Sequence, residues 1–284
     1  IRMLEDLTGI DAKTIPFDDP KTLSLFSSTE GIGLTPEQLQ GDQVASLAVP
    51  ECGTKFVRGM LEDSRPQTFS DLVRISGFSH GTNVWLDNAQ DLIKNGTCKL
   101  NEAISTRDDV MNFLIHRGMD RKHSFFVMEN VRKGKGIEKR NKQGQATTEF
   151  EAEMRENNIP EWFIESCKKI SYLFPRAHAV AYVMMAFRIA WFKVYHPLAF
   201  YAAYFSIRAK AFDLRIMTGD LKTQLTEFNR IKALDRAASP KDKDLMSALE
   251  VSMEMYQRGY RFINVDIQHS EARRFSIKDG ALLP

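Results

Sequence analysis

The feature that most constrains this fold is a long apolar segment, Arg176 to Tyr195, which follows Phe174-Pro175. A proline just before the segment and His196-Pro197 just after it are typical helix boundaries. The segment is apolar on nearly all sides, which indicates a helix enclosed by other elements. A second apolar helix is predicted over residues 198–207. We therefore expect a mainly α-helical fold built around a central buried helix.

Helix-start patterns recur along the rest of the chain, in which a Ser or Thr cap precedes an apolar-periodic run. The expected helices begin at Pro36, run from Phe69 to Gly77, from Thr82 to Asn95 and from Ser105 to Gly118, cover residues 149–157, and begin at Pro160. Near the C-terminal end, residues 262–267 and 274–277 alternate with period two, which predicts two short strands. The predicted class is mainly α, with a short β-containing segment at the C-terminal end.

Composition restricts the possible partners, sites and cellular setting of the protein less strongly. The chain has 39 Lys+Arg and 37 Asp+Glu, and this net charge of +2 neither favours nor excludes nucleic acid, because a local basic face matters more than the sum. Cys52, Cys98 and Cys167 form no CxxC pair, so no disulfide framework or zinc site is indicated and a cytoplasmic setting is expected. The uninterrupted apolar stretch 177–187 is too short to span a bilayer, so we expect no membrane contact.

Acidic pairs are the first candidates for metal chemistry. Asp18-Asp19 and Asp108-Asp109 are adjacent in the sequence, but neighbouring residues on a helix point in different directions. A two-metal site needs carboxylates that converge, and a capped acidic first turn explains Asp108 better than a metal site does. No Ser/His/Asp or Cys/His arrangement stands out. We therefore predict no catalytic residue and no metal ligand within this chain.

Anion binding is better supported, because a helix N-terminus presents unpaired N–H groups to a phosphate. Three predicted helix starts carry further donors: Ser79-His80-Gly81-Thr82, Arg107, and Arg176 with His178. Each has a structural alternative. The imidazole of His80 would satisfy a turn carbonyl, Arg107 would pair with Asp108, and His178 would be a hydrogen-bonded core histidine. Spacing alone does not show whether the three starts converge.

Basic and aromatic residues near these helices have two interpretations as well. The basic run from Arg132 to Lys142 fits either contact with a phosphate backbone or a solvated loop. Trp162, Tyr172 and Phe174 precede the central helix, where they would either stack on a base or pack in the core.

Several long motifs resemble one family. They are VRISGFSHGTNVW, GTKFVRGMLED, VRKGKG, FEAEMRENNIPEW and LFPRAHAVAYVMMAFRIAWFKVYHPLAFYAAYF. Together they resemble the fingers region of the PolC-type (C-family) bacterial replicative DNA polymerases, related to the DNA polymerase III alpha subunit, and the resemblance runs from Ile1 to Pro284. Because the chain starts at Ile1 inside a helical pattern, we interpret it as a piece of a larger protein.

The resemblance implies an activity and its partners. It implies a DNA-directed DNA polymerase, a nucleotidyltransferase, whose palm aspartates bind Mg²⁺ outside this chain, so the chain alone should be inactive. The implied partners are template–primer DNA and the incoming dNTP, with the sliding clamp and replisome proteins contacted through other parts of the enzyme. A non-catalytic helical module that binds nucleic acid or protein is the alternative.

The resemblance also implies residue roles. Ser76, Ser79, His80, Arg107, Tyr172, Phe174, Arg176 and His178 become candidate nucleotide-binding residues, and Arg132, Lys133 and Lys135 become candidate DNA-binding residues. Two departures stand out: Arg176 replaces an expected lysine, and the stretch Glu138 to Thr148 is longer than usual for the family.

A domain division follows from the same resemblance. Residues 1–50 are expected to lead from the palm into the fingers, residues 51–212 to form the fingers core, and residues 213–284 to lead toward a duplex-binding helix-hairpin-helix part.

Overall fold

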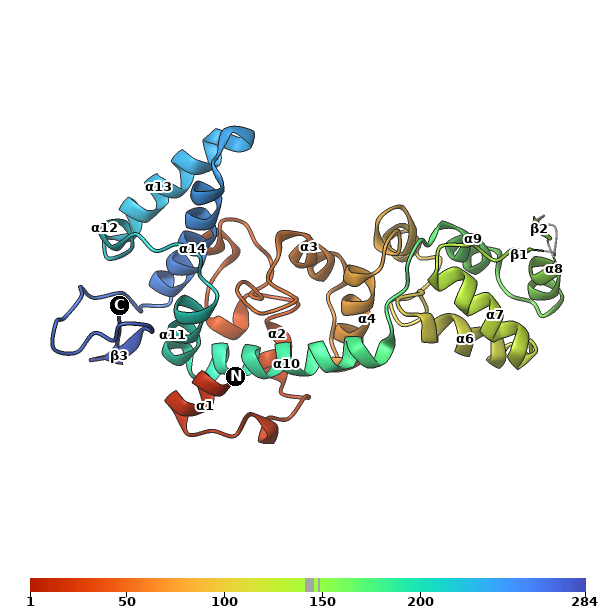
Figure 1. The fold of residues 1–284 in the computed structure, drawn as a ribbon, viewed down its shortest axis with the longest axis horizontal. Helices are drawn as coiled ribbons and strands as arrows, with labels where there is room; N and C mark the ends of the chain where they lie inside the picture. The colour runs from red at the N-terminus through yellow and green to blue at the C-terminus, as the bar shows by residue number, and fades with distance from the viewer. Residues whose placement is uncertain (141–145, 148) are drawn as a thin grey trace. The chain divides into compact units, whose positions relative to one another are not determined.

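The computed structural model of this protein describes residues 1–140, 146–147 and 149–284 (Figure 1). Within the described chain, contacts group the residues into two compact units, one of residues 1–58 and 185–284 and the other of residues 59–184. Helices α3 (Lys55–Ser64) and α10 (Arg176–Tyr195) each contribute residues to both units. The mainly helical class expected from the sequence is confirmed. The three-segment division at residues 50 and 212 stays a prediction.

The first unit combines short helical turns with longer helices. Its elements are α1 (Arg2–Thr8), η1 (Ala12–Thr14), α2 (Pro20–Ser24), η2 (Glu30–Ile32), η3 (Pro36–Leu39), α11 (Pro197–Ile207), α12 (Leu214–Met217), α13 (Leu221–Leu234), η5 (Asp235–Ala237), α14 (Pro240–Gln257), β3 (Ser276–Lys278) and β4 (Ala281–Leu283). A core of Phe200, Tyr201, Phe205, Leu249 and Met253 joins α11 to α14. Burial of such apolar surface is the main stabilising force for a helical unit of this kind.

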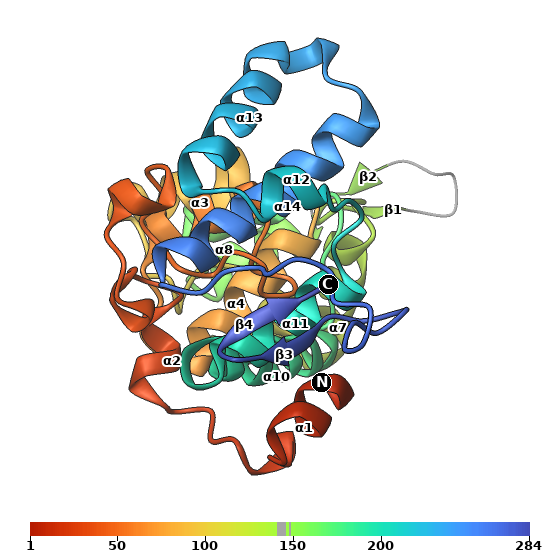
Figure 2. The ribbon, with the colours of Figure 1, turned by 90° about the vertical axis from the view of Figure 1, so that its left-hand side faces the viewer.

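The predicted strand pair at the C-terminal end forms, but with different residues. β3 and β4 pair antiparallel and contact α11 (Figure 2). Residues 262–267, predicted as a strand, form no strand; Phe262 makes a single bridge to Leu282. Asp279 and Gly280, both with positive φ, supply the tight turn that the hairpin needs. The prediction of a strand at 262–267 is therefore wrong, because an alternating pattern does not guarantee that a partner strand is available.

A buried ionic network crosses this unit. The ammonium of Lys193 is fully enclosed and donates to the carbonyl oxygens of Ala45 and Leu47, each at 2.7 Å, and to Oε2 of Glu254 at 2.8 Å. The hydroxyl of Tyr201 donates to Oε1 of Glu254 at 2.6 Å. Burial lowers the pKa of Lys193 to about 8, and the Glu254 carboxylate opposes that change. Every donor of Lys193 therefore has an acceptor, which is what a buried charge requires.

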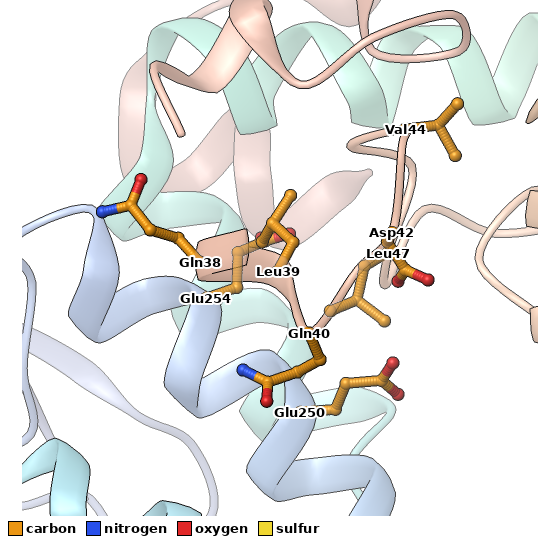
Figure 3. A pocket seen from close by; sticks show the side chains of 8 residues that line it. All are labelled: Gln38, Leu39, Gln40, Asp42, Val44, Leu47, Glu250 and Glu254. Carbon is orange, nitrogen blue, oxygen red and sulfur yellow. The ribbon is translucent and has the colours of Figure 1, made fainter. Parts of the chain in front are cut away.

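Beside this network lies a small hollow (Figure 3), lined by Gln38, Leu39, Gln40, Asp42, Val44, Leu47, Glu250 and Glu254. Its cavity volume is about 10 Å³, roughly the space of one water molecule. Arg58 reaches Oδ2 of Asp42 at 2.9 Å and Oε1 of Glu250 at 2.6 Å, so these carboxylates are already paired. The hollow is too small for an organic ligand.

Helix α10 was expected at the centre of the fold. Its inward residues include Ala179, Val183, Phe187 and Ala190, all nearly inaccessible to solvent. Taken over its whole length, and contrary to the expectation from the stretch 177–187, α10 is long and apolar enough to cross a bilayer. The core helix of a soluble protein passes the same test, and the buried ion pair of Lys193 lies on this helix.

The second unit holds the motifs on which the functional expectations depend. Its elements are α4 (Phe69–His80), η4 (Trp85–Ala89), α5 (Gln90–Lys94), α6 (Arg107–His116), α7 (Arg121–Arg132), β1 (Lys139–Arg140), β2 (Ala146–Thr147), α8 (Glu149–Glu156) and α9 (Glu161–Lys169). Helices α6 and α7 pack side by side (Figure 1). The longer loop expected from Glu138 to Thr148 lies partly outside the described residues.

Caps predicted from the sequence position these helices. The hydroxyl of Thr68 accepts the backbone N–H of Asp71 at 3.2 Å, while the Asp71 carboxylate accepts the N–H of Thr68 at 3.0 Å. Thr106 and Asp109 form the same reciprocal pair at the start of α6. The predicted starts of α4 and α6 are thereby confirmed, and α9 begins at Glu161 directly after Pro160, as expected.

The predicted end of α4 is wrong. The helix continues past Gly77 to His80, and Thr82 then bridges to Tyr172 instead of starting a helix. The next regular helix begins only at Gln90. Gly77 has another purpose, because a Cβ there would lie 2.6 Å from the carbonyl oxygen of Ser105. The glycine allows a close backbone approach and does not end the helix.

Candidate nucleotide-binding site

A short extended stretch, residues 171–175, organises the second unit; we call it the 171–175 segment. The N–H of Thr82 donates to the carbonyl of Tyr172 at 3.0 Å, and the N–H of Arg107 donates to the carbonyl of Phe174 at 3.2 Å. The N–H of Leu173 donates to the carbonyl of Arg132 at 3.3 Å. The segment therefore gathers the ends of α4 and α7 and the starts of α6 and α10. The three positions singled out in the sequence lie in one neighbourhood.

Close packing holds the end of α7 against this segment. Gly134 has φ +67°, and a Cβ on it would lie 2.5 Å from the carbonyl oxygen of Ser171. Both the left-handed backbone and the lack of space favour glycine here. The turn after α7 can then lie directly on the 171–175 segment.

At the start of α6, the Asp109 carboxylate satisfies backbone N–H groups, and Arg107 is half-buried. Oδ2 of Asp109 accepts the N–H groups of Ser105 and Thr106 at 3.1 and 2.8 Å, together with both hydroxyls. Within the described residues, the guanidinium of Arg107 has no carboxylate within ion-pair distance. The structural alternative, a pair between Arg107 and Asp108, is therefore absent among them.

Asp108 instead serves the neighbouring helix. Its Oδ2 accepts the backbone N–H of Arg176 at 2.9 Å, at the first turn of α10. The guanidinium of Arg176 lies 3.8 Å from Oδ1 of Asp109, a loose contact on a side chain that is 39 % exposed. Two arginines thus stand at two adjoining helix starts, where backbone N–H groups also give a partial positive charge.

His80 lies at a helix C-terminus, not at the N-terminus expected from the sequence. Its Nδ1 lies 2.8 Å from the carbonyl oxygen of Ser76 and 3.0 Å from the hydroxyl of Ser79. A carbonyl only accepts, so this contact requires the proton on Nδ1. The expectation that backbone N–H groups at Ser79–Thr82 bind an anion is corrected, since a C-terminus carries partial negative charge.

Aromatic rings extend from His80 over the start of α10. The imidazole of His80 stacks on Phe174, with centroids 4.8 Å apart, and on Tyr182 at 5.9 Å. His178 approaches Phe174 edge-on at 5.9 Å. His178 and Tyr182 are exposed and Phe174 is partly so. These four rings, the aromatic cluster, offer a surface against which a base or sugar can pack.

The remaining predicted nucleotide contacts differ in accessibility. Tyr172 is 39 % exposed, whereas Ser76 is 5 % exposed and its hydroxyl has no partner among the described residues. The hydroxyl of Ser79 donates to the carbonyl of Ser76 at 3.0 Å. Ser76 is therefore buried within α4, and the hydroxyl of Ser79 is hydrogen-bonded within the same helix. Their roles in nucleotide binding stay predictions.

The predicted DNA-binding residues divide into two kinds. Arg132 makes a bidentate pair with Glu129, at 2.8 and 2.9 Å, and Lys133 reaches the same carboxylate at 3.0 Å. Hydrogen bonds from Arg132 lower the pKa of Glu129 to about 2. Lys135 is exposed on the turn beyond α7. The basic run is therefore partly neutralised near α7.

Sequence reasoning missed Tyr182 and Asp108 as members of this site. Tyr182 follows His178 by four residues, so helical spacing places both on one face, and that signal was available. The bond from Asp108 to Arg176 joins residues far apart in the chain and had no signal in the sequence.

Metal-ligating side chains do not gather in the described part of the chain. Over residues 1–140, 146–147 and 149–284, no group of three or more His, Cys, Asp or Glu side chains is placed to hold a metal ion. The resemblance implies that Mg²⁺ is bound outside this chain, and we assign no metal-dependent step to these residues.

Comparison with known proteins identifies the family. Residues 1–158 match the family described as the bacterial DNA polymerase III alpha subunit finger domain. The chain is 55 % identical over 284 residues to the PolC-type DNA polymerase III of Caldanaerobacter subterraneus subsp. tengcongensis, and 51 % identical over 284 residues to that of Bacillus subtilis. It is 54 % identical over 285 residues to the PolC-type DNA polymerase III of Thermotoga maritima.

These matches cover 99–100 % of this chain but only 19–20 % of each relative, so the chain spans about a fifth of their length. The chain belongs to the finger-domain family of the bacterial DNA polymerase III alpha subunit.

Proposed function

We propose that this chain is the fingers module of a PolC-type replicative DNA polymerase and that it binds the incoming dNTP during template-directed synthesis. The observation that carries the proposal is the convergence of Arg107 and Arg176 at two helix starts joined through the 171–175 segment. A single arginine at a helix start is equally consistent with a phosphate-binding site and with an ordinary capped helix, so the proposal depends on Arg107 and Arg176 together.

The electrostatics of this neighbourhood favour a polyanion. An arginine guanidinium presents a planar set of donors that matches phosphate oxygens. The first turns of α6 and α10 add partial positive charge. The triphosphate would lie between the two guanidinium groups, which neutralise charge and hold it in position for attack by a primer hydroxyl.

The base and sugar would lie on the aromatic cluster. Phe174 contributes to the segment that fixes Arg107 and also stacks on His80. A ring anchored in this way gives stacking surface with little loss of side-chain entropy. His80 would then position the rings, and Tyr172 would contact the nucleotide from the exposed side.

Further parts of the proposal concern the longer protein. Arg132, Lys133 and Lys135 would face the backbone of template–primer DNA. Metal ions, the sliding clamp and replisome proteins would be bound by other parts of the polymerase, and this chain alone would have no polymerase activity. We place the protein in the cytoplasm.

The test uses the full-length protein that contains this chain. Arg107→Ala and Arg176→Ala should each raise the KM for dNTP and lower kcat/KM by about 10- to 100-fold, because each removes a charged hydrogen-bond donor. Arg117→Ala is the matched control, since Arg117 is exposed at the opposite end of α6. Unchanged kinetics for both Arg107→Ala and Arg176→Ala would overturn the proposal.

A further inference from the structure

An open hollow lies along α7, away from the 171–175 segment. It is lined by Lys122, His123, Phe126, Asn130, Lys135, Glu138 and Phe150, and its volume is about 410 Å³. Lys122, Phe126 and Asn130 follow each other at four-residue spacing, so they share one face of α7. A hollow of this size accommodates a nucleobase with its sugar.

Hydrogen bonds hold two residues of the hollow's lining, His123 and Asn130, in position. His123 Nδ1 lies 2.8 Å from Oε2 of Glu153, and the imidazole packs edge-on against Phe150 at 5.6 Å. The amide of Asn130 donates to the carbonyl of Glu138 at 2.9 Å, and the carbonyl of Asn130 accepts the N–H of Lys135 at 2.9 Å. The turn that carries Lys135 is thereby attached to α7.

An exposed aromatic ring stands in this hollow. Phe126 is 45 % exposed, although a ring of this size is normally buried in a soluble protein. The adjacent Phe125 is equally exposed, at 45 %, but it does not line the hollow. An exposed ring that lines a hollow has a free face on which a base can stack.

The charge around Phe126 is basic. Lys122 and Lys135 are both exposed, and within the described part of the chain neither ammonium has a carboxylate at ion-pair distance. Glu138 is the acidic residue of the lining whose carboxylate opposes them, while Glu153 beside the hollow is engaged by His123. Two cations that flank an aromatic ring complement a strand that carries phosphates and exposed bases.

We propose that this hollow binds the unpaired template strand, with one base stacked on Phe126 and the adjacent phosphates contacted by Lys122 and Lys135. Duplex DNA keeps its bases stacked inside the helix, so only an unpaired strand can offer a base to Phe126. The proposal rests on the proposed function and deepens it, because it names the part of the DNA that reaches α7.

The test measures binding of the full-length protein to a fluorescent primer–template with a 5′ oligo(dT) overhang. Phe126→Ala should weaken this binding by about 5- to 150-fold, the loss expected for one stacked base. Phe125→Ala should leave it unchanged, and Phe126→Trp should retain it, which shows that the fold is intact. Lys122→Ala and Lys135→Ala should each reduce the salt slope by about 0.7.

Two further substrates separate base stacking from electrostatic contact with the phosphate backbone. An overhang of abasic sites should bind the native protein and Phe126→Ala equally, and a blunt duplex should not distinguish them. An unchanged affinity of Phe126→Ala for the oligo(dT) overhang would overturn the proposal and leave the hollow to a protein ligand. The KM for dNTP should be the same in Phe126→Ala and the native protein. The template-strand proposal can therefore fail independently of the proposed nucleotide site.

Discussion

The backbone N–H of Arg176 donates a hydrogen bond to Oδ2 of Asp108 at 2.9 Å. A side chain in the first turn of α6 thereby satisfies the first turn of α10, and the two helix starts share one carboxylate. This carboxylate also places a negative charge beside the arginines that we propose for the triphosphate. Asp108 therefore orders the site and weakens its attraction for anions at the same time.

Replacing Asp108 should separate these two effects. Asp108→Asn retains an oxygen that accepts the N–H of Arg176 but removes the charge. We expect a lower KM for dNTP, by about 2- to 5-fold at low salt, because one repulsive charge disappears. The free energy of unfolding should fall by at most about 1 kcal/mol. Steady-state kinetics at two salt concentrations, with thermal denaturation, measure both quantities.

The matched variant is Asp91→Asn, which removes an exposed carboxylate from the first turn of α5. Its KM should not change. A higher KM in Asp108→Asn would show that positioning of Arg176 outweighs the repulsion.

Gly134 offers a test of the packing between α7 and the 171–175 segment. Gly134→Ala forces a Cβ to within 2.5 Å of the Ser171 carbonyl at φ +67°. Gly136 has almost the same φ, +68°, but nothing lies within 4 Å of its added Cβ. We expect Gly136→Ala to cost about 1 kcal/mol from the backbone alone, and Gly134→Ala to cost at least about 1 kcal/mol more. Equal denaturation midpoints would contradict the close approach.

The buried pair of Lys193 and Glu254 should respond unequally to single and double replacement. Lys193→Met leaves Glu254 buried without its cation, so we expect a loss of about 3–5 kcal/mol in the free energy of unfolding. Lys193→Met combined with Glu254→Met removes both charges and should recover most of that loss. Urea denaturation measures all variants, and a double variant no more stable than the single one would show that the pair contributes net stability.

Glu129 should make the free energy of unfolding depend on pH in the acid range. Hydrogen bonds from Arg132 lower its pKa from 4.5 to about 2. A carboxyl whose folded-state pKa lies below its unfolded value contributes stability that is complete above about pH 4.5 and is lost as the pH falls through 2. Screening by water limits the effect to at most about 1 kcal/mol. NMR titration of the carboxyl gives the pKa directly, and Glu129→Gln should lack this part of the acid dependence.

Local sequence patterns predicted several helix starts, because the causes of these starts are local. Thr68 with Asp71, and Thr106 with Asp109, form their reciprocal hydrogen bonds within four residues, so the residues that decide each start are adjacent in the chain. Such caps hold in almost any tertiary setting. The apolar character of α10 predicted a helix enclosed on nearly all sides, but one face of its first half, with Ala181, Tyr182 and Met185, is exposed.

Gly77 shows where such reasoning fails. A glycine after an apolar-periodic run usually ends a helix, but here its missing side chain makes room for Ser105, and α4 continues to His80. The predicted strand at 262–267 failed for a related reason, because a strand exists only where a partner is available. Neither outcome is encoded within the few residues that form the pattern.

The mainly helical class, the starts of several helices and the resemblance to one family could all be read from the amino-acid sequence, because caps, apolar periodicity and long motifs are properties of adjacent residues. The meeting of Arg107, Arg176 and the aromatic cluster could not. It depends on hydrogen bonds of the 171–175 segment to residues 82, 107 and 132, across long separations in the chain. Such contacts form only when the helices pack, since each requires loop closure that packing energy must offset.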